Sequence, residues 1–148
     1  MQKSKQAPAY SVVNVALYVR GATDREHSMI DAQLDRLTSM VEHRRAQGEN
    51  WVVRDRLVER GKSAYDTQRP GYRRLLKLAR SRQIDVVAVT ELNRISRNIS
   101  DFVKLMEELN RNGVRLVSLR EHVDLASSMG WLTKIHSFRR MAEKRRLC

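Results

Sequence analysis

The sequence predicts one α/β domain, built on a mostly parallel central sheet with helices on both faces. Segments rich in β-branched apolar residues alternate along the chain with segments of helical periodicity, the pattern of repeated strand–helix–strand units. The segment 84–90 (IDVVAVT) is almost wholly apolar, as parallel strands covered on both faces are. Together with a second apolar segment, 12–19, it is predicted to lie at the centre of the sheet. A length of 148 residues, with 41% hydrophobic and 31% charged residues, suits a single globular domain with a buried core.

The N-terminal part is expected to hold an arm, a strand and a helix. Residues 1–11 are polar and are predicted to be a flexible arm. The strand at 12–19 (VVNVALYV) follows. Ser28 and Asp31 fit a capping box, in which the serine oxygen accepts from a free amide of the first helical turn and the acid reaches back. The helix that they begin is predicted to end near Gly48.

The middle of the chain is expected to add an edge strand, a loop and a helix. The segment 51–58 has strand composition but is more polar, which favours the edge of the sheet. The segment 59–69 contains turn-forming residues and is predicted to be a mobile loop. Pro70 suits the first turn of a helix that ends near Arg82.

The C-terminal part is expected to complete the domain and then change character. A helix is predicted over 98–112, stopped by Asn-Gly, and a strand over 114–119. The domain is predicted to span 12–130. The remaining segment, 131–148, is rich in lysine and arginine and is expected to be a basic tail or a truncated helix.

Composition narrows the classes of function. The net charge is +12 and the isoelectric point is near 10.7, which favours a polyanionic partner, DNA or RNA. The single cysteine, Cys148, excludes a disulfide framework and CxxC metal sites. The four histidines lack ligand spacing, so neither a metal nor a cofactor is expected. No apolar run approaches a membrane span or a signal peptide, so a cytoplasmic location is predicted.

Arginines gather where two predicted strands end. Arg20 follows the strand at 12–19, and Arg94 and Arg97 follow the strand at 84–90. Because sites in open α/β sheets form beyond the carboxyl ends of the strands, these side chains are expected to converge. Arg69 lies on the intervening loop and is expected to be the least fixed of them. Converging guanidiniums repel one another unless an anion lies among them, and a phosphate fits their geometry. The alternative, that Arg94 and Arg97 are solvated surface residues, fits the spacing equally well.

The chain resembles the serine site-specific recombinases of the resolvase/invertase group over about residues 13–130. No single motif carries the resemblance, but their order and spacing together are specific. The matching motifs are Tyr18-x-Arg20-x-x-Thr23, Ser28-Met-Ile-Asp-Ala-Gln33, Gly61-x-Ser63, Arg69-Pro-Gly71-Tyr-x-x-Leu-Leu76, Ile84-Asp85-Val-Val-x-Val, Leu92-x-Arg94-x-Ser96-Arg97, Asp101, Gly113-Val-Arg-Leu-Val-Ser118 and Ser128-Met-Gly130.

The resemblance implies strand cleavage and exchange on double-stranded DNA. In that family a serine hydroxyl attacks a DNA phosphodiester, a phosphoserine link forms and a sugar hydroxyl is released. Fixed arginines stabilise the charge of the phosphoryl transition state, a role that falls here on Arg20, Arg69, Arg94 and Arg97. The resemblance further implies a homodimer or tetramer in the full-length context.

Supporting roles are implied for a second set of residues. Gln33 is expected to support the site, and Asp85 to support the residues that contact phosphate. Asn93 stands where many members have aspartate, so it can form hydrogen bonds but cannot accept a proton as a carboxylate does. Tyr18 and Thr23 belong to the first motif.

The central departure is Ala22, which stands where the family has its nucleophilic serine. A methyl group cannot attack phosphorus, so the chain is expected to be inactive as an enzyme, and the neighbouring Thr23 is not expected to replace the serine. A natural inactive relative and an engineered change both fit. Three functions follow: a recombination enzyme disabled at position 22, a non-catalytic pseudo-recombinase that associates with DNA or an active relative, and a basic α/β RNA-binding protein. The third does not account for the ordered motifs.

Overall fold

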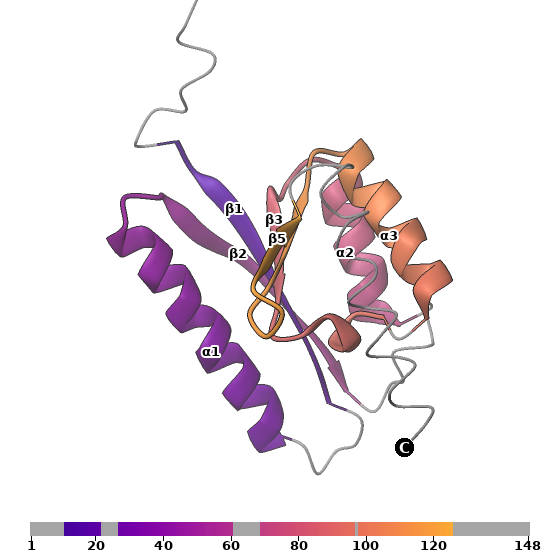
Figure 1. The fold of residues 1–148 in the computed structure, drawn as a ribbon, viewed down its shortest axis with the longest axis horizontal. Coiled ribbons are helices and arrows are strands. Elements are labelled where there is room, and N and C mark those ends of the chain that lie inside the picture. Colours follow the sequence, from indigo (N-terminus) through magenta and orange to yellow (C-terminus); the bar gives the residue numbers. More distant parts are fainter. Residues whose placement is uncertain (1–10, 22–26, 61–68, 97, 126–148) are drawn as a thin grey trace, which may run out of the picture.

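The computed structural model describes residues 11–21, 27–60, 69–96 and 98–125 of the chain. They form a five-stranded sheet in the order β2-β1-β3-β4-β5 (Figure 1). Neighbouring strands pair in parallel, except that β5 is antiparallel to β4. The strands are β1 (Val13–Gly21), β2 (Trp51–Arg60), β3 (Val86–Val89), β4 (Arg115–Ser118) and β5 (Val123–Leu125). The predicted fold class is confirmed, with β1 and β3 adjacent at the centre and β2 at an edge.

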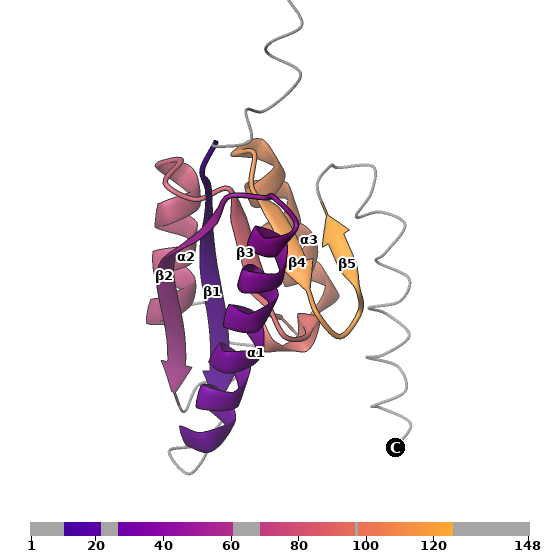
Figure 2. The same ribbon diagram turned by 90° about the vertical axis from the view of Figure 1, so that its left-hand side faces the viewer.

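Helices cover both faces of the sheet. Helix α1 (His27–Ala46) lies on one face, and α2 (Pro70–Arg80) and α3 (Ile99–Arg111) lie together on the other (Figures 1 and 2). A 3-10 turn, η2 (Leu92–Arg94), follows β3 and precedes α3.

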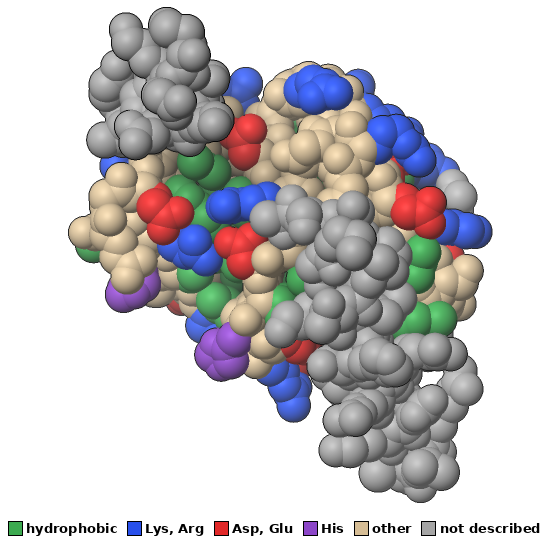
Figure 3. Space-filling model, turned by 45° about the horizontal axis from the view of Figure 1, so that its top comes forward, with side chains coloured by type: hydrophobic (Ala, Val, Ile, Leu, Met, Phe, Trp, Pro, Cys, Tyr) green, Lys and Arg blue, Asp and Glu red, His purple; other side chains and the backbone are tan. Residues whose placement is uncertain are grey.

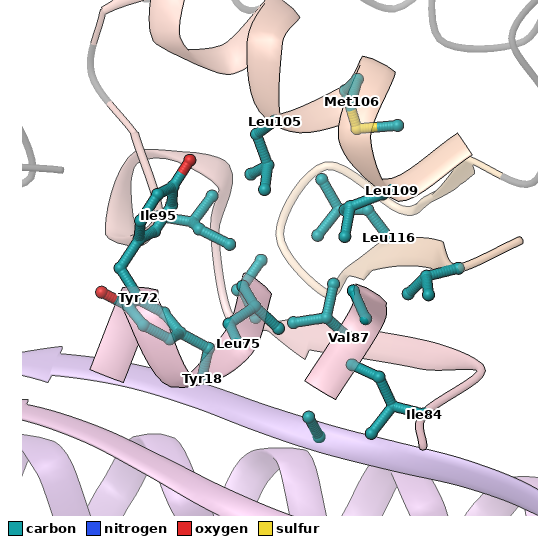
Figure 4. Close-up of a cluster of buried hydrophobic side chains, with 14 of the residues drawn as sticks. Tyr18, Tyr72, Leu75, Ile84, Val87, Ile95, Leu105, Met106, Leu109 and Leu116 are labelled. Carbon is teal, nitrogen blue, oxygen red and sulfur yellow. The ribbon is translucent and has the colours of Figure 1, made fainter. Parts of the chain in front are cut away.

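Each face of the sheet has its own core. The apolar side chains of β1 alternate between the two, because successive residues of a strand point to opposite faces. On the α2–α3 side, Tyr18 and Val87 pack with helix residues such as Leu75, Leu105 and Leu109 (Figure 4). On the α1 side, Leu17 packs with side chains that include Ile30, Leu37 and Trp51.

Local capping explains where two helices begin. Asn98 caps α3, because its side-chain oxygen accepts from the amides of Ser100 at 2.8 Å and Asp101 at 3.3 Å. Pro70 stands in the first turn of α2, as predicted. The stop predicted at Asn112–Gly113 is confirmed, since α3 ends at Arg111.

Three local predictions are wrong. Helix α1 begins at His27, so Ser28 lies inside its first turn and not at the position before it. Strand β5 was not expected, because three residues give too little alternation to detect. Strand β2 extends to Arg60, into the segment assigned to a loop. The rest of that loop, most of the N-terminal arm and the segment 126–148 lie outside the described residues, so the predicted domain end at residue 130 stays a prediction.

Candidate functional site

The candidate site lies at the carboxyl edge of the sheet, where β1 and β3 end side by side. Arg20 is the last residue but one of β1 and is only 3% exposed. Arg94 ends the η2 turn that follows β3. Because the two strands pair in parallel, their carboxyl ends meet at one edge, which brings these two arginines together.

Arg20 and Arg94 bind each other's backbone reciprocally. The Nε of Arg20 donates to the carbonyl of Arg94 at 3.3 Å, and the Nη1 of Arg94 donates to the carbonyl of Arg20 at 3.3 Å. The end of β1 is thereby joined to η2, and two cationic side chains are held next to each other.

Gln33, a residue of α1, forms two hydrogen bonds to the backbone of Arg20. Its Nε2 donates to the Arg20 carbonyl at 3.0 Å and its Oε1 accepts from the Arg20 amide at 3.3 Å. The side chain is 4% exposed and therefore has few competing water contacts. Gln33 therefore lies against the backbone of Arg20, and the supporting role expected of it stays a prediction.

Arg69 is the most deeply buried of the arginines that the structure describes at this edge, with 1% of its surface exposed. Its Nη2 donates to the carbonyl of Ile95 at 2.8 Å. Its guanidinium carbon lies 5.5 Å from the ring centre of Tyr18 and 4.9 Å from that of Tyr72. Its Nε and Nη1 are buried without a hydrogen-bond partner among the described residues. The expectation that Arg69 is the least fixed arginine is wrong, because aromatic contacts and burial hold it beside η2.

Glu59, a buried carboxylate that binds Tyr18, was not predicted from the sequence. It lies near the end of β2 and is 2% exposed. Its two oxygens accept from the amides of Gly71 and Tyr72 at 3.0 Å each, in the first turn of α2, and from the Tyr18 hydroxyl at 3.1 Å. An anion is favoured there, because the first amides of a helix have no partner within the helix. A lone acid in a polar strand carries no sequence signal of such a role.

Tyr18 lies between Glu59 and Arg69 and stays neutral. Burial raises the pKa of its hydroxyl far above the usual value; the positive charge of Arg69 opposes the rise, and the Glu59 carboxylate adds to it. The protonated hydroxyl is therefore a hydrogen-bond donor to Glu59. Figure 4 shows the rings of Tyr18 and Tyr72 together at one end of the buried cluster, close to Ile95.

Asn93 and Glu91 complete the strand-end segment. Asn93 is buried within η2, between Leu92 and Arg94. The Glu91 carboxylate pairs with Arg94 Nε at 3.2 Å and with Arg120 Nη1 at 2.8 Å. Arg94 is therefore a structured residue with defined partners, and its interpretation as a freely solvated side chain is wrong.

Asp85 is not part of this site. It precedes β3, at the amino edge of the sheet, where its carboxylate accepts from the amide of Asn14 at 2.8 Å. Arg20 lies six positions after Asn14 along β1, a distance of roughly 20 Å along a strand. The predicted support from Asp85 is wrong, since the residue fixes the opposite end of β1.

The remaining site residues, Ala22, Thr23 and Arg97, lie outside the described residues. Within the described part, no group of three or more histidine, cysteine or acidic residues could hold a metal ion. Nor does that part contain a helix long and apolar enough to cross a membrane.

The comparison with known families is decisive. Residues 15–147 match the family described as Resolvase, N terminal domain. The chain belongs to the resolvase family. Two curated relatives of this resolvase domain come from Staphylococcus aureus. This chain is 40% identical over 83 residues to the transposon Tn552 DNA-invertase BinR, and the match covers 55% of this chain and 42% of that protein. This chain is 30% identical over 119 residues to the transposon Tn552 resolvase, and the match covers 79% of this chain and 56% of that protein. The chain therefore spans about half the length of these relatives.

Solved structures agree with the family. The N-terminal catalytic domain of TP901-1 integrase superposes on this resolvase domain with a TM-score of 0.71 and 33% identity, covering 90% of this chain and 96% of that one. A resolvase family site-specific recombinase from Streptococcus pneumoniae superposes with a TM-score of 0.67 at 21% identity, covering 90% and 88%, and so supports the fold alone.

Proposed function

We propose that this resolvase domain serves site-specific DNA recombination, by holding a phosphate of double-stranded DNA among Arg20, Arg69, Arg94 and Arg97. The observation that carries the proposal is the reciprocal bonding of Arg20 and Arg94 at the carboxyl edge of the sheet. It supports the proposal because two guanidiniums lie together at the end of β1, the strand that precedes position 22. A third, Arg69, reaches the same edge through the Ile95 carbonyl.

The chemistry of the cluster suits a phosphodiester. Guanidinium groups match the geometry and charge of phosphate oxygens, and their attraction is strong where water is scarce. Arg69 is nearly fully buried and has two nitrogens without a partner among the described residues, so it retains donors for an anion. Three backbone contacts fix the cluster before any ligand arrives, as stabilisation of transition-state charge requires.

The covalent step is what this chain lacks. In the family reaction a serine oxygen forms a bond to phosphorus while the bond from phosphorus to the sugar oxygen breaks, and the sugar leaves as a hydroxyl. Ala22 offers no oxygen for this step. We therefore propose an arginine site complete for binding and incapable of cleavage.

A non-catalytic role is the second candidate, and Ala22 favours it. In that case the domain associates with DNA or with an active relative, as a dimer or tetramer of the full-length protein. The cytoplasmic location predicted from the sequence is compatible with either role, because both act on DNA.

Restoring the nucleophile separates the two candidates. The domain is fused to the remaining parts of an active relative, once with Ala22 and once with Ala22→Ser, and each fusion is incubated with that relative's recombination site. Covalent protein–DNA adduct is measured on denaturing gels. The first candidate predicts an adduct from the Ala22→Ser fusion and none from the Ala22 fusion.

The other outcomes are equally informative. An adduct from the Ala22 fusion means that Thr23 or another residue attacks, which contradicts the proposed role of position 22. No adduct from either fusion, with DNA binding intact, means that Asn93 or another departure has also disabled the site. The pseudo-recombinase candidate is then favoured.

A further inference from the structure

We infer that Glu121, on the turn between β4 and β5, is a positioning residue for the arginine site. Its Oε1 accepts from the backbone amide of Leu92 at 3.2 Å and also binds the hydroxyl of Ser118. Leu92 is the first residue of η2, the turn that ends in Arg94. The inference rests on the proposed function for its consequence in catalysis, but the contact itself is a property of this fold.

The amide of Leu92 needs a partner from outside η2. The first amides of any helical turn have no acceptor within that turn. The side chain of Glu91, which precedes η2, makes no capping hydrogen bond to it, and that carboxylate is engaged with Arg94 and Arg120 instead. Glu121 supplies the acceptor from a segment 29 residues further along the chain. The start of η2 is thus set by the β4–β5 turn.

The backbone of the β4–β5 turn lies along the same segment. The amide of Leu119 donates to the Val89 carbonyl at 3.1 Å, and the amide of Arg120 donates to the Thr90 carbonyl at 2.8 Å. The side chain of Arg120 continues this contact to Glu91 at 2.8 Å. The chain from residue 89 to residue 92 is therefore held by successive residues of one turn, with Glu121 as its last contact.

This support reaches both central arginines. Arg94 lies two residues after Leu92 and is bound reciprocally to Arg20. A shift at the start of η2 therefore displaces the Arg94 guanidinium and the carbonyl to which Arg20 Nε donates. Charge stabilisation in a phosphate site depends on fixed donors, so small displacements of this kind matter for the proposed chemistry.

Packing alone does not account for a carboxylate at this position. The second oxygen of Glu121 is buried without a hydrogen-bond partner among the described residues. Such an oxygen costs stability, because it loses its water without gaining a donor. An apolar residue would fill the space without that cost but could not accept from the Leu92 amide.

The test compares Glu121→Ala with Glu121→Gln in the full chain, with Glu107→Ala as the control. Glu107 is exposed on α3, and its replacement removes the same charge. Amide hydrogen exchange is followed residue by residue by NMR. In Glu121→Ala the amides of Leu92 and Ile95 should exchange roughly tenfold to a hundredfold faster, the range expected for loss of a hydrogen bond to a charged acceptor. Glu121→Gln keeps an acceptor oxygen and should retain most of the protection.

Three results would overturn the inference. One is unchanged exchange at Leu92 in Glu121→Ala. Another is equal loss of protection in Glu121→Gln and Glu121→Ala. The third is faster exchange spread evenly over the sheet, which indicates a merely structural role.

Placed in the Ala22→Ser fusion, Glu121→Ala should slow adduct formation at least tenfold while Glu121→Gln should not. If the parent fusion forms no adduct, the proposed function fails and the exchange data still decide the role of Glu121.

Discussion

At the scale of single residues, bonds to backbone carbonyls and contacts with aromatic rings hold the arginines of the site. Arg20, Gln33 and Arg94 were predicted from strand ends and motifs, and the structure brings them together. The burial of Arg69 between two tyrosines was not predictable, because it depends on α2 packing against β1 and β2. Glu59 was missed for the same reason, since its partners come from β1 and from the start of α2.

The Glu59 network predicts a large loss of stability on a small change. The two carboxylate oxygens of Glu59 accept from two backbone amides and the Tyr18 hydroxyl. Glu59→Gln replaces one of these acceptor oxygens with a donor nitrogen. At least one buried donor then faces another donor. The free energy of unfolding should fall by about 2 kcal/mol, measured by urea denaturation. Glu107→Gln, an exposed change of the same kind, should lie within about 0.5 kcal/mol of the parent. Equal stabilities for the two variants would contradict the network.

Tyr18 predicts a specific dependence of stability on alkaline pH. Its pKa in the folded protein is raised above the ordinary value of 10.0, first by burial. The neutral hydroxyl is favoured in the folded state, so this contribution is fully present below pH 10 and is lost as the pH rises above it. Between pH 10 and 11 the free energy of unfolding of Tyr18→Phe should fall by about 1 kcal/mol less than that of the parent, and the difference approaches about 1.4 kcal/mol per pH unit above that range. Parallel curves for the two proteins would contradict the assignment.

At the scale of elements, periodicity located each α-helix of the described residues and all of their strands but β5. The predicted end of α2 near Arg82 was close, and the reason for it lies in the backbone. The helix ends at Arg80, and the amides of Arg82 and Gln83 then donate to the carbonyls of Ala79 and Leu78. This is a Schellman motif, in which the residue after the cap takes a left-handed conformation. Glycine usually stands there, so the arginine gave no stop signal.

The left-handed residue predicts a stabilising substitution. Arg82 has a φ of 57° and is exposed. Arg82→Gly relieves the steric conflict of a side chain at that backbone angle and should raise the free energy of unfolding by about 1 kcal/mol. Lys77→Gly, in the interior of the same helix, should lower it by about 1 kcal/mol. Urea denaturation of both variants checks the prediction, and loss of stability in Arg82→Gly would show that the side chain has contacts of greater value.

At the scale of the whole molecule, topology decides which motif residues belong to the site. Asp85 and Arg94 flank the same strand, yet they lie at opposite edges of the sheet because β3 runs between them. Motif order alone could not separate them. The parallel pairing of β1 with β3 explains both results: it joins Arg20 to Arg94 at the carboxyl edge and Asn14 to Asp85 at the amino edge.

The charge of the chain predicts weak and sequence-blind DNA binding by this domain. The net charge is +12, although acidic side chains lie among the basic ones on the face drawn in Figure 3. Phosphate contacts of this kind carry no base information, so affinity should fall steeply with salt. Competition between a relative's recombination site and a shuffled duplex, measured by gel shift, should give a preference below about 10³-fold. A larger preference would mean that this chain reads bases directly.

The central claim is that fixed arginines form a phosphate site beside a position that lacks its nucleophile. The most direct measurement is the rate of covalent adduct formation by the Ala22→Ser fusion, with and without Arg94→Gln. Arg94→Gln should slow that rate at least a hundredfold, as loss of one fixed donor to a developing charge does, while DNA affinity changes little. Arg36→Gln, an exposed change on α1, should leave the rate within about twofold. Equal rates with and without Arg94 would contradict the account.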